Sequence, residues 1–206
     1  MVLSLMHGNL GAILDKICQV FRAEGRPGGI AAADALERIN CAETELKTQD
    51  SAPLSLLDAA AGQSSALPLA KAVCECAGLF AWQHWAEGEL DAEVSSNLYT
   101  TELVGPDGVW FDSAVRVGLL ISAADTDYPV SSHSGEETYY VISGVAEWTL
   151  DDGIYRPVHP GELVHHPAWK PHGRRTLDEV FLGAWRWSGD LDLASFRVDA
   201  AAGATR

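Results

Sequence analysis

A short segment in the second half of the chain, residues 129–144, carries side chains that could bind a metal. If the segment is extended, His133, Glu137 and Tyr139 point to the same face, because successive strand residues alternate faces. An imidazole and a carboxylate on one face suit Zn²⁺, Fe²⁺, Mn²⁺ or Ni²⁺. His172 follows Glu137 by 35 residues, beside a turn, and offers a second imidazole. His133, Glu137 and His172 are therefore the candidate metal ligands.

Each of these residues also has a structural explanation. His133 and Glu137 could be a turn histidine and a surface carboxylate, and Tyr139 could be a packed core ring, since tyrosine is common in strands. His165 and His166 are adjacent, so a strand would point them to opposite faces. We expect both side chains to be hydrogen-bonded within the protein or exposed, although one of them could hydrogen-bond to a metal ligand and orient it. Bystander or exposed positions are also expected for His159, Glu136, Arg116 and Arg174, although either arginine could hold a carboxylate.

The region from about Leu98 onward reads as strands. Short alternating or β-rich runs are separated by turns that contain Gly, Pro and Asp, and six of the nine prolines lie in residues 106–171. Many short strands at regular spacing predict a sandwich or a closed barrel. The candidate strands are Leu98–Val104, Val109–Phe111, Val115–Ser122, Thr138–Ile142, Ala146–Leu150, Leu163–His166 and Val180–Trp187.

The first 93 residues read as helical instead. Apolar residues from Leu10 to Phe21 recur at the spacing of an amphipathic helix. A shorter Ala-rich helical pattern covers Ile30–Ile39, and a third helix is predicted from Leu69 to about Trp85. We therefore expect a helical region, residues 1–95, that packs on a β-barrel, residues 96–206, which carries the metal site. The helices would cover the barrel or form a dimer interface.

Composition and charge exclude several classes of function. The chain of 206 residues is 47% hydrophobic and 21% charged, as in soluble globular proteins. Its net charge of −15 disfavours nucleic acid and anionic membranes as partners. We find neither a signal peptide nor an apolar run long enough to span a membrane, and we expect the four cysteines to be reduced and buried. We therefore expect a cytoplasmic protein that acts on a small-molecule substrate. The protein itself could form a homodimer.

Two motifs, in order along the chain, resemble those of the cupin superfamily, whose fold is a small double-stranded β-helix. The first cupin motif has His-x-His, then a Glu, then a Gly, and the second has a Pro-Gly turn, a Pro and a His. The matching residues here are His133, Glu137 and Gly144 for the first motif, and Pro160, Gly161, Pro167 and His172 for the second. The resemblance implies a mainly β fold, a cupin jelly-roll barrel with an N-terminal α-helical extension.

One position departs from the cupin pattern, because Ser131 stands where the first histidine of His-x-His is expected. Three strong ligands would remain, and the fourth position would be open or filled by water, substrate or Tyr139. An open position is what a catalytic metal needs. The same change weakens the site, so a metal-free or weakly loaded protein is the alternative.

A narrower resemblance is to the dimethylsulfoniopropionate lyase cupins, which also carry helices before the barrel. The residues that carry it are Tyr128, Pro129, Glu136–Gly144 and Trp185–Asp190. The first motif of that family reads His-x-x-x-Glu-x-Tyr, as His133, Glu137 and Tyr139 do here. The resemblance implies one divalent transition metal, Zn, Fe, Mn or Ni, held by His133, Glu137 and His172, with Tyr139 as the catalytic base.

The reaction of that family is a β-elimination that converts dimethylsulfoniopropionate into acrylate, dimethyl sulfide and a proton. A metal-bound carboxylate makes the neighbouring carbon easier to deprotonate, and aromatic rings can hold a sulfonium through cation–π contacts. We select Tyr128 and Trp187 as the substrate-binding rings. Two alternatives are an Fe(II) cupin dioxygenase acting on a small organic acid or thiol, and a non-catalytic cupin that binds a small molecule.

Overall fold

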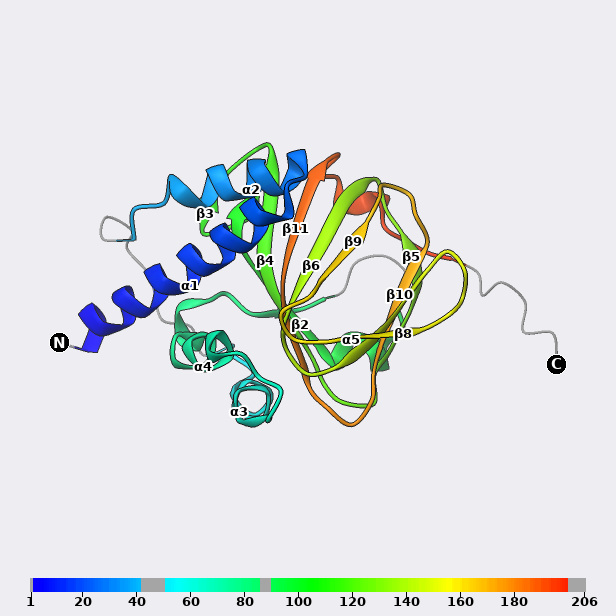
Figure 1. Ribbon diagram of the computed structural model, residues 1–206, viewed down its shortest axis with the longest axis horizontal. Helices are drawn as coiled ribbons and strands as arrows, with labels where there is room; N and C mark the ends of the chain where they lie inside the picture. Colours follow the sequence, from blue (N-terminus) through cyan, green and yellow to red (C-terminus); the bar gives the residue numbers. More distant parts are fainter. Residues whose placement is uncertain (1, 42–50, 86–89, 200–206) are drawn as a thin grey trace.

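Two mostly antiparallel sheets face each other and form a β-barrel, and helices from the first part of the chain pack against one side of it (Figure 1). The structure is a computed structural model that describes residues 2–41, 51–85 and 90–199. The larger sheet lies toward the helices, and the smaller sheet closes the opposite side of the barrel (Figure 1).

The larger sheet has the strand order β1-β2-β4-β11-β6-β9, with β3 added beside β2. Its strands are β1 Gln83–His84, β2 Leu98–Gly105, β3 Trp110–Phe111, β4 Val115–Ser122, β6 Gly135–Ser143, β9 Leu163–His166 and β11 Phe181–Gly189. The smaller sheet has the order β12-β5-β10-β7-β8. Its strands are β5 Asp127–Ser132, β7 Ala146–Leu150, β8 Arg156–Val158, β10 His172–Thr176 and β12 Arg197–Val198.

The chain passes back and forth between the two sheets from β4 to β7 and again from β9 to β12. This alternation is the wrapping of a jelly roll, in which two sheets share the strands of one coiled ribbon. The predicted fold class, a mainly β cupin barrel with N-terminal helices, is therefore confirmed.

The helical part begins with a long amphipathic helix, as predicted. The helices are α1 Val2–Glu24, α2 Pro27–Glu37, α3 Leu54–Gly62, α4 Pro68–Glu75 and α5 Ala92–Ser96, with short 3₁₀ turns η1 Ala77–Leu79 and η2 Leu193–Ser195. Leu10, Ile13 and Phe21 of α1 are completely buried, because the apolar stripe faces the other helices and the barrel. Pro27 starts α2 at a position where a missing N–H costs nothing.

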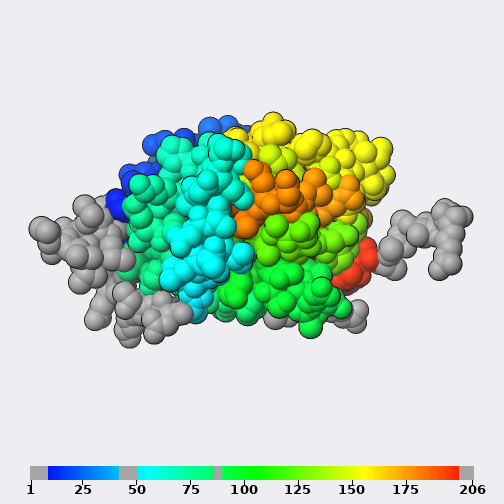
Figure 2. Space-filling model, turned by 90° about the horizontal axis from the view of Figure 1, so that it is seen from below, coloured from blue at the N-terminus to red at the C-terminus, as the bar shows by residue number. Residues whose placement is uncertain are grey.

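One prediction about this part of the chain is wrong, and one helix was missed. The third predicted helix, from Leu69 to about Trp85, ends at Glu75, and Gln83–His84 is instead the edge strand β1 of the larger sheet. The helix α3 was not predicted at all. Gln63, directly after α3, attaches it to the barrel, because its side chain donates to Val180 O at 3.0 Å and accepts from Val180 N at 2.7 Å. Figure 2 shows this cyan helix beside the orange segment that leads into β11.

The central strands β4 and β11 of the larger sheet are buried on both faces. All eight residues of β4 are buried. Val117 and Leu119 belong to the apolar core shared with the helices, whereas Leu120 belongs to a second core inside the barrel. Successive residues of one strand therefore serve two different cores, which is why β4 reads as an almost continuous apolar run.

No disulfide joins the four cysteines, all of which lie among the described residues. Cys18 and Cys76 are buried, but Cys41 and Cys74 are only partly buried, which corrects the expectation for those two. Among the described residues, no helix is long and apolar enough to cross a membrane.

Candidate metal centre

Three imidazole nitrogens surround one carboxylate oxygen inside the barrel. Glu137 Oε2 lies 3.4 Å from His133 Nε2 and 3.6 Å from His172 Nε2. The same oxygen lies 3.1 Å from His166 Nδ1. Each of His133, Glu137 and His172 offers one ligand atom, these atoms lie within 4.8 Å of one another, and all three residues are buried. We call these three residues the ligand cluster; the structure brings together the three ligands that the sequence predicts.

The register of the larger sheet places the groups around Glu137. On β6, Glu137 has His166 of β9 as one cross-strand neighbour and Trp187 of β11 as the other. Cross-strand neighbours point to the same face of a sheet. Both therefore reach the carboxylate, and Trp187 Nε1 donates to Glu137 Oε1 at 2.7 Å. His133 comes from the connection between β5 and β6, and His172 is the first residue of β10.

Backbone carbonyls orient both histidines of the ligand cluster. His133 Nδ1 lies 3.0 Å from Gly135 O, and His172 Nδ1 lies 2.8 Å from Lys170 O. A carbonyl oxygen can only accept, so Nδ1 donates in each case and Nε2 keeps its lone pair. Histidines that bind metals typically have such a partner on the other ring nitrogen. The two Nε2 atoms that face Glu137 are thus prepared to bind a cation.

The protonation states suit the same purpose. Burial, reinforced by the neighbouring His166, holds the pKa of His172 well below its ordinary value, so the ring is neutral. Burial opposes the charged form of Glu137, but its contacts with the imidazoles of His133 and His166 outweigh burial and hold the pKa of this carboxyl well below its ordinary value. Two imidazole nitrogens and one carboxylate form a donor set that fits a divalent transition metal.

His166 is a contact of Glu137 that the sequence left undecided. The side chain is completely buried, and its ring stacks on that of His172 with 3.9 Å between ring centroids. Its Nε2 is buried and has no hydrogen-bond partner among the described residues. Burial lowers the pKa of His166. The alternation rule required one of the two adjacent histidines to face the barrel interior, but only the pairing of β9 with β6 shows that it is His166.

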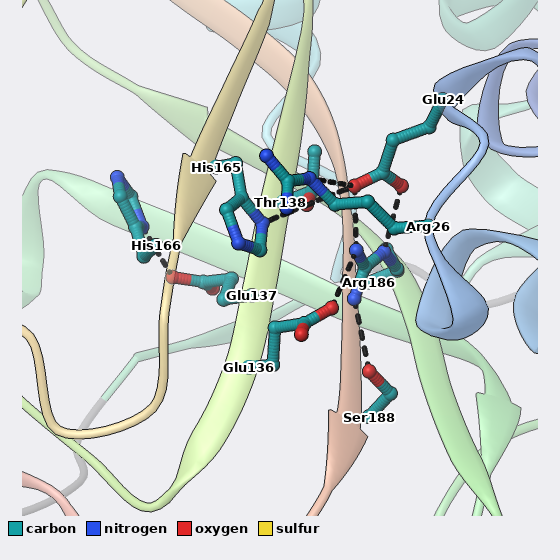
Figure 3. A network of polar contacts seen from close by, with 9 residues as sticks. All are labelled: Glu24, Arg26, Glu136, Glu137, Thr138, His165, His166, Arg186 and Ser188. Carbon is teal, nitrogen blue, oxygen red and sulfur yellow. Dashed lines mark hydrogen bonds and ion pairs between the residues drawn. The ribbon is translucent and has the colours of Figure 1, made fainter.

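His165 and His159 lie outside the ligand cluster. Figure 3 shows His165 and His166 on opposite sides of β9, as the sequence predicted. His165 Nδ1 lies 3.0 Å from Thr138 Oγ1, on the side that faces the helices. His159 is exposed between β8 and the following turn, as expected. Glu136 was expected to be solvated, but its side chain is only 34% exposed and it pairs with Arg186 at 2.9 Å.

Ser131 occupies the position of the missing cupin histidine. It is the cross-strand neighbour of His172, because β5 pairs with β10 in that register, and it is completely buried. Within the described part of the chain, no hydrogen-bond partner is found for its hydroxyl oxygen. The barrel interior therefore has a serine where a fourth ligand of the cupin pattern would stand.

The ligand cluster lines a pocket that the other predicted site residues also line. Tyr139 and Tyr128 line this pocket, and so does Trp187. Burial and the charge of Glu137 raise the pKa of Tyr139 well above its ordinary value, and burial raises that of Tyr128. One face of the Trp187 indole is already covered, because it stacks on His133 with 4.1 Å between centroids. Trp187 is thus positioned to hold the ligand cluster as much as to contact a substrate.

Both arginines that were expected at the surface are buried. Arg116 is 6% exposed, and it pairs with Glu102 at 2.6 Å and with Asp107 at 2.8 Å. Arg174 is 4% exposed and lines the pocket. Burial lowers its pKa, but a guanidinium retains its proton at neutral pH. The charge of Arg116 is neutralised locally, and that of Arg174 points into the pocket.

Comparison with known proteins agrees with this geometry. The family model described as dimethylsulfoniopropionate lyase matches residues 42–182, which is more than half of the chain. The chain belongs to the dimethylsulfoniopropionate lyase family. The match includes His133, Glu137, Tyr139 and His172, and it ends in β11 before Trp187.

Two relatives in the dimethylsulfoniopropionate lyase family support the assignment. The chain is 33% identical over 92 residues to dimethylsulfoniopropionate lyase DddQ of Ruegeria pomeroyi, which covers 45% of this chain and 46% of that protein. It is 29% identical over 124 residues to the putative dimethylsulfoniopropionate lyase DddL of Cereibacter sphaeroides, which covers 59% of this chain and 51% of that protein. The chain thus spans about half the length of these two relatives.

Solved structures of the dimethylsulfoniopropionate lyase family match over nearly the whole chain. A chain from the crystal structures of the DMSP lyases RdDddP and RnDddQII superimposes with a TM-score of 0.65 at 26% identity, covering 92% of this chain and 98% of that one. DddQ from Ruegeria pomeroyi superimposes with a TM-score of 0.62 at 21% identity, covering 92% and 99%. The second likeness shows a shared fold that includes the helices.

Proposed function

We propose that this chain cleaves dimethylsulfoniopropionate into acrylate and dimethyl sulfide by β-elimination at the pocket above the ligand cluster. The observation that carries the proposal is the convergence of His133, Glu137 and His172 in a pocket that Tyr139 also lines. Membership of the dimethylsulfoniopropionate lyase family supports the same substrate.

We assign the ligand cluster to one divalent transition metal. Such a metal would act as a Lewis acid toward the substrate carboxylate, and its positive charge would favour the tyrosinate form of Tyr139. The chain itself prepares the cluster: two carbonyls fix the imidazoles, and the Trp187 N–H holds the carboxylate of Glu137. A fixed and buried donor set of this kind needs no rearrangement when it binds a cation.

We assign the role of base to Tyr139. Its oxygen would take the proton from the carbon next to the carboxylate, and the electron pair of that C–H bond would form the double bond of acrylate. The bond to sulfur then breaks, and dimethyl sulfide leaves as a neutral molecule that needs no acid. Tyr139 is suited to this step by position, because it follows Glu137 by two residues on β6 and so faces the same pocket.

Headspace gas chromatography of dimethyl sulfide tests the proposal. Metal-loaded protein under nitrogen should release dimethyl sulfide and acrylate in equal amounts. His133→Ala should abolish the release, whereas His159→Ala, which alters an exposed histidine, should leave it unchanged. Failure of the loaded wild-type protein to cleave dimethylsulfoniopropionate would refute the proposed reaction. Two histidines and a carboxylate also suit oxygen activation by Fe(II), and turnover that requires oxygen would assign the site to that chemistry instead.

A second experiment isolates the base. Tyr139→Phe should lower the rate by about 10²- to 10⁴-fold, the usual contribution of general acid–base catalysis. The metal content of the variant should equal that of the wild type if the tyrosine acts on the substrate. An unchanged rate would exclude Tyr139 as the base, and the proposed substrate would then need a different proton acceptor.

A further inference from the structure

Among the residues that the structure describes, no carboxylate forms an ion pair with the buried guanidinium that lines the pocket. Arg174 lies on β10, is 4% exposed and lines the pocket. Its guanidinium carbon lies 4.6 Å from the ring centroid of Phe181, 5.6 Å from that of Tyr128 and 5.7 Å from that of Trp148. In the part of the chain that the structure describes, these ring contacts replace the carboxylate that a buried arginine normally has.

Two other arginines are buried in the described part of the chain, and they show the contrast. Arg116 contacts two carboxylates, at 2.6 and 2.8 Å. Arg186, which is completely buried, also contacts two, with Glu24 at 2.5 Å and Glu136 at 2.9 Å. Because moving a charge out of water is costly, a buried charge is usually kept only with a partner. Among the buried arginines that the structure describes, the exception is the one that faces the pocket, so its partner is expected to arrive with a ligand.

The strand geometry sets where that ligand would lie. Arg174 follows His172 by two residues on β10, so both side chains face the interior, about 7 Å apart along the strand. A carboxylate with one oxygen at the ligand cluster could therefore present its other oxygen to the guanidinium. Arginine suits this task, because its planar N–H groups match the geometry of a carboxylate.

We propose that Arg174 binds the carboxylate of the substrate and holds it against the ligand cluster. This inference rests on the proposed function for the identity of the acid, and it adds a positioning and specificity-determining residue to the same pocket. It requires the ligand to be a small carboxylic acid and excludes neutral analogues of the same size. It also fixes the orientation of the substrate in the pocket, because the rings around Arg174 already contact the guanidinium and are not free to hold the sulfonium. The sulfonium would then lie toward Trp85, Trp185 and Phe196, which line the rest of the pocket.

Binding of propionate, followed by NMR titration of the metal-loaded and the metal-free chain, tests this role. Arg174→Met should raise the dissociation constant of propionate about 10- to 100-fold, as expected for losing a charged hydrogen bond. Arg174→Lys keeps the positive charge and should restore part of the affinity. The matched control is Arg175→Met, since Arg175 is the next residue but pairs with Glu147 at 2.6 Å and is 43% exposed. Neutral propionamide should bind none of the four proteins measurably, because it lacks the charge that Arg174 would pair with.

Thermal unfolding separates an anion-binding role from a structural one. Without ligand, Arg174→Met should unfold at a higher temperature than the wild type, because it removes an unpaired buried charge. Propionate should stabilise the wild type and Arg175→Met but leave Arg174→Met unchanged. A lower unfolding temperature for Arg174→Met, or wild-type affinity of this variant for propionate, would overturn the inference.

The two proposals can fail independently. If the loaded chain cleaves dimethylsulfoniopropionate while Arg174→Met keeps the wild-type KM and propionate affinity, Arg174 has no such role and the reaction stands. If the chain leaves dimethylsulfoniopropionate intact but binds propionate only through Arg174, the anion site stands and the proposed reaction is wrong.

Discussion

A buried ion-pair network joins α1 to the barrel, in addition to the apolar core that the two parts share, and the Glu24→Ala substitution would break it. Arg186 of β11 is completely buried, and Glu24 at the end of α1 accepts from its Nε at 3.0 Å and its Nη2 at 2.5 Å. Glu136 of β6 contacts the same Nη2 at 2.9 Å, and Ser188 accepts from Nη1 at 2.9 Å (Figure 3). The substitution removes one of two carboxylates and leaves two buried N–H groups unpaired.

Removing one partner of a buried ion pair typically costs about 3–5 kcal/mol, because the remaining charge stays buried without compensation. Glu136 and Ser188 still satisfy part of Arg186, so we expect the lower end, about 3 kcal/mol. The matched control is Glu37→Ala. Glu37 pairs with Arg22 at the similar distance of 2.9 Å, but these side chains are 59% and 41% exposed, so the loss should fall within experimental error.

Urea unfolding followed by tryptophan fluorescence and circular dichroism measures both losses. Glu24→Ala should strongly lower the urea concentration at the midpoint of unfolding, and Glu37→Ala should hardly change it. The slope of the free energy of unfolding against urea concentration should be unchanged in both variants. Adding Arg186→Met to Glu24→Ala should recover part of the loss, because no uncompensated arginine remains. Equal losses for Glu24→Ala and Glu37→Ala would refute the argument that burial determines the strength of this network.

Three further outcomes follow from single contacts. Trp187→Phe keeps an aromatic ring but removes the N–H that donates to Glu137, so competition with a chelator should show metal affinity about 10- to 100-fold weaker. Unchanged affinity would contradict the role of this hydrogen bond in holding Glu137. Burial is the main reason why the pKa of the Cys74 thiol is raised to about 11. At pH 8, iodoacetamide should therefore modify Cys74 about 100-fold more slowly than a thiol of pKa 9, and the rate should rise about tenfold per pH unit up to that pKa. Mass spectrometry can follow the reaction, and a rate equal to that of a thiol of pKa 9 would contradict the raised pKa. Gly144 has φ +78° and a Cβ there would lie 2.2 Å from Val180 O, so Gly144→Ala should destabilise the fold by more than about 2 kcal/mol in urea unfolding; wild-type stability would contradict it.

Most of the barrel could be predicted from local patterns. The bounds of β4, β7 and β9 agree with the predicted strands residue for residue, because each contains an apolar or β-branched run bounded by turn residues. The strands β5 and β10 could not be recognised. β5 contains Pro129, which weakens a strand prediction, and the residues of β10 are mostly polar or charged because they line the site and the surface.

The ligand cluster was accessible from the sequence because its spacing follows a motif, whereas its supporting residues depend on tertiary pairing. Nothing local shows that His166 rather than His165 faces Glu137; that choice is made by the register of β9 against β6. Arg174 was expected at the surface because charged residues usually are exposed. Its burial follows from its place two residues after His172 on an inward-facing strand, which could be known only once β10 was recognised.

Metal analysis of the purified chain tests the central claim most directly. After chelation and reloading with a single divalent transition metal, inductively coupled plasma mass spectrometry should find one ion per chain in the wild type and in His159→Ala. His133→Ala, Glu137→Ala and His172→Ala should each retain far less than one equivalent, while circular dichroism shows them folded. A wild-type chain that binds no metal after loading, or ligand variants that bind as much as the wild type, would contradict the account of this site.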